Sequence, residues 1–213
     1  MEITITQSGD LPSILNSVLE VLAGGFVGFV TAVFSDVARN KLFGPRILLE
    51  FGQGDCYQTP TPEYDMHHDV AMGTHQAKYF RIKALNKGRY LANTCRAYLV
   101  AIEKRNTNGV FENTQYCDSI PLAWSCRQPT EYDPIDLPRD IEQFIDLVSI
   151  RDTSADFRIH TKVDIARYRA ILHDQGTFRF TVQVSGHNVP PSTIRVEFTW
   201  ARAWGSEAAA TSP

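Results

Sequence analysis

Histidine, cysteine and acidic residues gather in one part of the chain, between Cys56 and His75. Within it, the segment Glu63–Asp69 reads EYDMHHD. Imidazole, thiolate and carboxylate groups are the usual protein ligands of zinc and other transition metals. The candidate metal ligands are His67, His68, Asp69 and His75.

The spacing of these residues weakens the metal hypothesis. The adjacent side chains of His67 and His68 point in different directions in most backbone conformations, and the segment has no HxH or HxxxH pair. A long polar loop between the first two strands of a β domain is the simpler interpretation. Loops of this length are often functional or mobile even where they bind no metal. No cofactor is predicted.

No other segment carries a recognisable catalytic pattern. His173 and Asp174 form an acid–base pair in ILHDQG, but no nucleophile accompanies them. Ser125 in AWSC lacks the Gly-x-Ser-x-Gly context of a nucleophile elbow. The chain has neither a P-loop nor a GxGxxG motif that opens a helix after a strand. We therefore expect a protein that is not an enzyme.

Composition places the chain among ordinary globular proteins and excludes some partners. It has 213 residues, 43% of them hydrophobic, and a net charge of −3. This mild acidity provides no basic footprint for nucleic acid. Its four cysteines are compatible with two disulfides in an oxidising compartment or with four thiols in a reducing one.

A long helix is predicted over residues 12–35. At 1.5 Å per residue, the part from Pro12 to Phe34 would extend about 34 Å, enough to cross a hydrocarbon core of about 30 Å. Pro12 suits a first helical turn, and Asp10 or Ser13 suits its cap. Gly44 and Pro45 follow a basic turn and would end helical structure there.

Polar and small residues recur every three or four positions in this segment, which places them on one face of a helix. Gly24 and Gly28 form a GxxxG pair, which lets two helices pack closely in lipid. Glu20 indicates a helix–helix or pore-side interface, because an unpaired carboxylate inside a membrane is costly. The predicted association face is Ser13, Ser17, Glu20, Gly24, Gly28, Thr31 and Ser35.

Three interpretations of this helix are open: a single membrane span, an amphipathic helix packed on a soluble domain, and a cleaved signal peptide. The polar face is narrow and the apolar surface is wide, the reverse of a soluble surface helix, which favours the span. A signal peptide is disfavoured because the segment before Leu11 contains Glu2 and Asp10 but no lysine or arginine.

The flanking charges predict how such a span is oriented. Arg39, Lys41 and Arg46 follow it, and no basic residue precedes it. The positive-inside rule then places the N-terminus outside the inner (cytoplasmic) membrane and the C-terminal domain in the cytoplasm. The cysteines would be reduced in that location.

After Arg46 the pattern changes to short runs of alternating or β-branched residues separated by turn residues. The segments 46–51, 78–86 and 94–103 alternate as strands do. The strongest pair is TFRFTVQV and TIRVEFTW, joined by a predicted loop, SGHNVPPS. About nine strands at this spacing predict an antiparallel sandwich or barrel. A short helical turn is predicted at 163–173, and Trp124, Trp200 and Trp204 are expected to be core or rim residues.

The segment YFRIKALNKGRYLANTCRAYLV resembles the second and third strands of bacterial immunoglobulin-like domains of the CARDB-like type. In those domains a strand ends in an Asn-x-Gly turn, and a strand of alternating residues follows. GTFRFTVQVSGHN is similar to their penultimate strand. The resemblance implies an immunoglobulin-like sandwich and no particular activity.

The expected architecture is mainly β: an immunoglobulin-like antiparallel β-sandwich preceded by one long transmembrane α-helix. Its expected parts are an N-terminal segment (1–11), the transmembrane helix (12–35), a basic juxtamembrane linker (36–45), the sandwich (46–204) and a flexible tail (205–213).

The functional prediction is a membrane-anchored module whose cytoplasmic sandwich binds or senses an unknown protein or small-molecule ligand. Its predicted partners in the membrane are lipid and either a second copy or another membrane helix. A membrane effector or pore-type assembly and a subunit of a larger envelope machine are compatible with the same pattern. The alternative is a soluble or extracytoplasmic metal- or ligand-binding domain or enzyme that uses the Cys56–His75 segment.

Overall fold

The computed structural model divides the chain into two compact units, residues 1–44 and 45–213. The residues described are 25, 26, 29, 32, 34, 35, 43–52, 56–65, 70–116, 118–127, 130–154, 156–163, 175–202, 204, 210 and 211.

In the first unit, the described residues between positions 25 and 35 have helical backbone and exposed side chains. Phe26, Phe29 and Phe34 expose 69, 68 and 71% of their surface. Within the described part of the chain, no helix is long and apolar enough to cross a bilayer. The predicted helix over 12–35 lies mostly outside the described residues, so its bounds remain a prediction.

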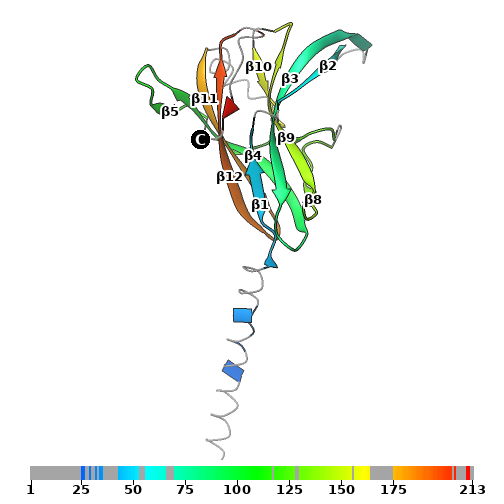
Figure 1. The fold of residues 1–213 in the computed structure, drawn as a ribbon, viewed down its shortest axis with the longest axis vertical. Coiled ribbons are helices and arrows are strands. Elements are labelled where there is room, and N and C mark those ends of the chain that lie inside the picture. The colour runs from blue at the N-terminus through cyan, green and yellow to red at the C-terminus, as the bar shows by residue number, and fades with distance from the viewer. Residues whose placement is uncertain are drawn as a thin grey trace, which may run out of the picture. The chain divides into compact units, whose positions relative to one another are not determined.

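The second unit is built of short and long strands (Figure 1). In chain order they are β1 (Ile47–Glu50), β2 (Cys56–Asp65), β3 (Val70–Asn86), β4 (Ala92–Arg105), β5 (Phe111–Asn113), β6 (Ile120–Pro121), β7 (Ala123–Trp124), β8 (Ile135–Leu137), β9 (Glu142–Arg151), β10 (Phe157–Ile159), β11 (Gly176–Gly186), β12 (Val189–Trp200) and β13 (Ala210–Thr211).

These strands form two sheets, and the strand pairs within them are antiparallel. One sheet has the order β1-β3-β9-β10, with β2 paired to β3 and β7 paired to β9. The other has the order β13-β12-β11-β4-β5, with β6 and β8 paired to β4. The prediction of a mainly β, sandwich-like fold is confirmed.

Alternation along the long strands supplies the core between the sheets. In β11, Phe178, Phe180, Val182 and Val184 are fully buried, and the residues between them are partly exposed. The sheets meet through aromatic rings: Phe80 of β3 lies 5.1 Å from Phe198 of β12, centroid to centroid. This period of two is what sequence alternation predicts for a strand with one buried face.

Two loops predicted from sequence are strands in the structure. The segment after the first strand forms the hairpin of β2 and β3, which pair from Cys56–Phe80 to Asp65–Val70. Within SGHNVPPS, only His187 and Asn188 form the turn, because β11 ends at Gly186 and β12 begins at Val189. Prolines at positions 190 and 191 suggested a loop, but both are exposed at the start of β12, where proline is tolerated.

The three tryptophans are core or rim residues, as predicted, and two of the cysteines differ in burial. Trp124 and Trp200 are 1% exposed and belong to the core, and Trp204 packs partly buried against it. Cys95 is buried, which raises the pKa of its thiol to about 11. Cys126, in contrast, is an exposed free thiol. The predicted helical turn at 163–173 lies almost wholly outside the described residues.

Candidate functional site

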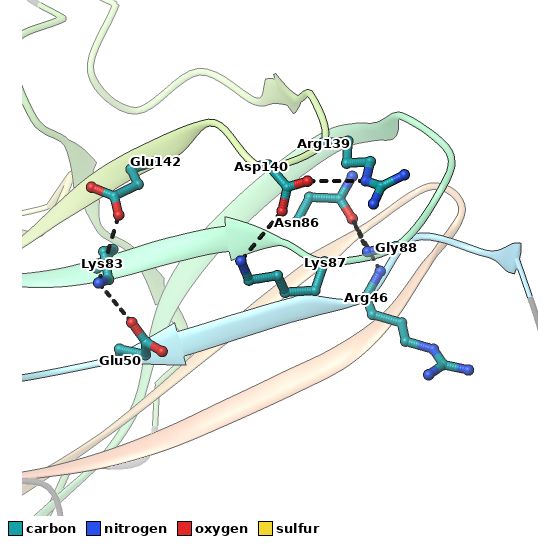
Figure 2. A network of polar contacts seen from close by, with 9 residues as sticks. All are labelled: Arg46, Glu50, Lys83, Asn86, Lys87, Gly88, Arg139, Asp140 and Glu142. Atoms are coloured by element: carbon teal, nitrogen blue, oxygen red, sulfur yellow. Dashed lines mark hydrogen bonds and ion pairs between the residues drawn. The ribbon is translucent and has the colours of Figure 1, made fainter.

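Asn86, the last residue of β3, joins three parts of the chain where the polypeptide enters the sandwich (Figure 2). Its Oδ1 accepts hydrogen bonds from the backbone N–H of Arg46 at 3.2 Å and of Gly88 at 2.9 Å. Its Nδ2 donates to the carbonyl oxygens of Tyr90 at 2.8 Å and Leu137 at 2.9 Å. The side chain is 0% exposed.

These four contacts use the full capacity of the amide, which has two donors and an acceptor oxygen with two lone pairs. The bond from Gly88 forms an Asx turn, the reason asparagine is common at such positions. The two Nδ2 bonds reach a loop four residues away and a strand 51 residues away. Asn86 therefore fixes the β3–β4 loop and the end of β8 to the first residues of the domain.

Ion pairs surround this buried amide at the surface (Figure 2). Asp140 receives Lys87 Nζ at 3.3 Å and Arg139 Nε at 3.0 Å. The hydrogen bond from Lys87 holds the pKa of the Asp140 carboxyl below its usual range. The backbone N–H of Asp140 donates to the Asn86 carbonyl at 3.0 Å. Exposed pairs of this kind contribute little stability each, so the buried amide is the main constraint.

The hairpin turn between β11 and β12 belongs to the same end of the sandwich. Asn188 Nδ2 donates to the Leu91 carbonyl at 2.8 Å, and its Oδ1 accepts the Asn93 N–H at 2.8 Å. The N–H of His187 donates to the Asn93 carbonyl at 3.0 Å. We call this set of segments the entry-end surface. It comprises Arg46, Lys87–Leu91, Pro138–Ile141 and His187–Asn188.

The entry-end surface is basic in an acidic chain. It holds four basic residues (Arg46, Lys87, Arg89 and Arg139) and one acidic residue, a net charge of +3, whereas the whole chain has −3. It also exposes apolar groups: Tyr90, Leu91 and Ile141 are 43, 44 and 49% exposed. The structure thus brings basic and apolar side chains together from segments that are far apart in sequence.

A second polar cluster lies around Asp146 of β9, which is 8% exposed. Its Oδ1 accepts Arg81 Nε at 2.7 Å and Ser125 Oγ at 2.6 Å. Nearby, His160 Nε2 lies 2.9 Å from Ser149 Oγ. A hydrolytic triad needs one serine bonded to a histidine that is oriented by the acid, but here Asp146 and His160 bond different serines. The cluster therefore lacks the connectivity of that triad.

Burial sets the protonation of His160 in this cluster. It lowers the pKa of His160 to about 4, Asp146 partly offsets the shift, and Arg158, Arg151 and Arg81 reinforce it. In the unfolded chain the pKa of a histidine is about 6.5. Between these two values the unfolded state binds more protons, so stability rises with pH across this window.

We therefore expect the free energy of unfolding to fall by about 2 kcal/mol as the pH is lowered from 7 to 5. Chemical denaturation followed at several pH values measures this loss. The matched control is His160→Gln, which keeps a polar group near Ser149 but does not titrate. An equal loss in wild type and His160→Gln would assign the effect to other groups.

No protein-family model matches this chain, and no curated protein matches it. In the first unit, Ser35 is exposed with helical backbone, and the other six residues of the predicted association face lie outside the described residues. Of the topology-determining residues, Arg46 is exposed on the entry-end surface, whereas Arg39 and Lys41 are also outside the described part.

The candidate metal ligands are described only in part. His75 lies within β3, five residues after its first residue, Val70. That separation is roughly 16 Å along an extended strand. It is 4% exposed, and neither ring nitrogen has a hydrogen-bond partner among the residues that the structure describes. His67, His68 and Asp69 are outside the described residues, so a shared metal remains a prediction. Among the residues described, no group of three potential ligands is close enough to hold a metal ion.

Sequence reasoning missed the role of Asn86 and the cluster around Asp146. The NKG motif at 86–88 indicated a turn, and this local signal is correct. The long-range partners of Asn86 left no sequence signal, because the carbonyl of Leu137 comes from another sheet element. Asp146 lies beside a bulge in β9. There the pairing with β3 shifts by one residue between Phe80 and Arg81, which sets Asp146 opposite Arg81.

Proposed function

We propose that this chain is a single-pass, membrane-anchored module and not an enzyme. A helix over residues 12–35 anchors it in the inner membrane, and an immunoglobulin-like sandwich in the cytoplasm binds a protein or small-molecule partner. The helix associates with a second copy, or with another membrane helix, through Gly24 and Gly28. The four cysteines are reduced in this location.

The exposed phenylalanines at positions 26, 29 and 34 carry this proposal. Each is about two-thirds exposed or more, with helical backbone. Burying one such side chain is worth about 1.5–3 kcal/mol, so three exposed to water on one short segment are unfavourable. Lipid, or another helix within lipid, removes that cost.

The described sandwich residues support a binding role. The buried core of this unit is drawn from residues between Ile47 and Trp200, so these elements supply their own core. The polar cluster around Asp146 has the residue types of a hydrolase but not the connectivity. Antiparallel sandwiches present loops at their ends, and loops on a rigid scaffold are common binding sites.

Membrane fractionation with a protease-accessibility assay on a C-terminal tag tests the proposal. The tag should be in the membrane fraction, protected in intact cells and cleaved in inverted vesicles. Protein in the soluble fraction would contradict the anchor, and a tag cleaved in intact cells would contradict the orientation.

Association through the helix is tested in the same membranes. Gly24→Leu with Gly28→Leu should lower the oligomer mass in mild detergent, because leucine side chains keep the backbones apart. Phe26→Leu with Phe29→Leu is the control, at two exposed helical residues outside the association face. Unchanged mass in the double variant would contradict self-association.

A further inference from the structure

We propose that the entry-end surface rests on the anionic lipid headgroups of the membrane, so that the sandwich is held against the bilayer by its own loops. This inference depends on the membrane anchoring proposed above. It adds a second lipid contact to the tether and assigns that contact to particular residues. The partner is a negatively charged bilayer surface.

Charge is the first argument. Arg46, Lys87, Arg89 and Arg139 are all exposed, and Asp140 is the acidic residue among them. A surface of +3 on a chain of −3 is attracted to anionic lipid, and the exposed carboxylate of Glu142, which borders this surface, is paired with Lys83. Each basic residue near such a membrane strengthens binding about fivefold.

The exposed apolar groups are the second argument. Tyr90 and Leu91 lie directly after Arg89, and Ile141 follows Asp140. All three are more than 40% exposed. Tyrosine is enriched at the membrane–water interface, where its ring contacts lipid and its hydroxyl stays hydrated. Basic residues beside aromatic and aliphatic ones are typical of surfaces that lie on a bilayer.

Chain connectivity is the third argument. The polypeptide enters the sandwich at Arg46, so this end is the part of the domain tethered nearest to any preceding membrane segment. Asn86 ties Arg46 to Gly88 (Figure 2). It also bonds the carbonyls of Tyr90 and Leu137, which presents the loops as one preformed surface. A preformed surface loses little conformational entropy on binding.

The test is hydroxyl-radical footprinting of the full chain in nanodiscs of phosphatidylcholine alone or mixed with phosphatidylserine. Tyr90 and Leu91 should be oxidised at least about fivefold more slowly in the anionic discs. Tyr57 of β2 is 53% exposed and serves as an internal reference whose rate should not change. The protection should weaken at 1 M salt, where the screening length falls to about 3 Å.

Charge variants identify the residues responsible. Lys87→Glu, Arg89→Glu and Arg139→Glu together should abolish the protection, and the corresponding glutamine triple variant should reduce it. The matched control is Arg127→Glu, Lys162→Glu and Arg202→Glu, which changes the net charge equally at exposed positions outside the entry-end surface. The control should keep the protection.

The possible outcomes separate this inference from the anchor. A chain that enters the discs but is oxidised equally in both lipids overturns the inference and leaves the anchor standing. A chain that does not enter the discs overturns both. If inorganic phosphate protects Tyr90 and Leu91 in neutral discs, the lipid contact is overturned in favour of an anion site. If protection is seen in native membranes but not in pure anionic lipid, it is overturned in favour of a protein partner.

Discussion

Replacing Asn86 with alanine should lower the free energy of unfolding by about 3–5 kcal/mol. The substitution removes four hydrogen bonds from a side chain that is 0% exposed. The backbone groups left without their partner include the Leu137 carbonyl in a buried contact. A buried polar group without a partner costs about 1–3 kcal/mol.

The measurement is denaturation of the full chain in detergent, followed by the fluorescence of Trp124 and Trp200, which are both in the core. Asn188→Ala is the matched control, because Asn188 also bridges two loops but is exposed. It should cost about 1 kcal/mol or less. Similar losses in the two variants would mean that Asn86 is not the buried constraint described above.

This result would also bear on the membrane surface. If Asn86 fixes Tyr90 and the end of β8, its loss should disturb the entry-end surface before the rest of the sandwich. Tyr90 would then lose its lipid-dependent protection under conditions in which Trp200 remains buried. Loss of both together would instead indicate global unfolding.

Replacing Phe157 with alanine should cost about 3–5 kcal/mol. Phe157 belongs to β10 of one sheet and is 4% exposed. Its ring contacts four rings of the other sheet, at centroid distances from 5.2 to 6.4 Å: Phe178, Phe180, Phe198 and Trp200. Truncation leaves a cavity between two sheets that are too constrained by hydrogen bonding to close it fully.

The same denaturation assay measures this effect. Phe157→Leu should cost less than half as much, since it keeps most of the apolar volume. Val110→Ala is an exposed apolar control, at 58% exposure, and should change stability by less than about 0.5 kcal/mol. A small loss in Phe157→Ala would show that the sheets do not depend on this contact.

The sequence by itself determined the β character of the second unit. Alternation in TFRFTVQV and TIRVEFTW predicts the paired strands β11 and β12, because side chains on a strand alternate between two faces. A second local signal, the turn-forming residues of NKG, identified the turn at Asn86. The apolar segment before Phe34 also has a purely local signal, and its role in a membrane remains a prediction.

Only the tertiary structure decided which residues meet. The sequence predicts residues 78–86 of β3 as a strand, but β2 and the first part of β3 as a loop. The prolines and polar residues of β2 mask its alternation, and pairing with β3 overrides their weak propensity. The cluster at Asp146 likewise depends on a bulge in the pairing of β3 and β9.

The entry-end surface shows why the tertiary structure was needed. Its basic and apolar residues come from segments separated by as much as 95 residues, from Arg46 to Ile141. Each segment alone is an ordinary turn with one or two charges. Sheet topology and the buried amide of Asn86 place these turns at one end of the sandwich. The hydrogen bonds that join the turns connect residues far apart in sequence, so the fold, and not the neighbouring residues, determines which groups pair.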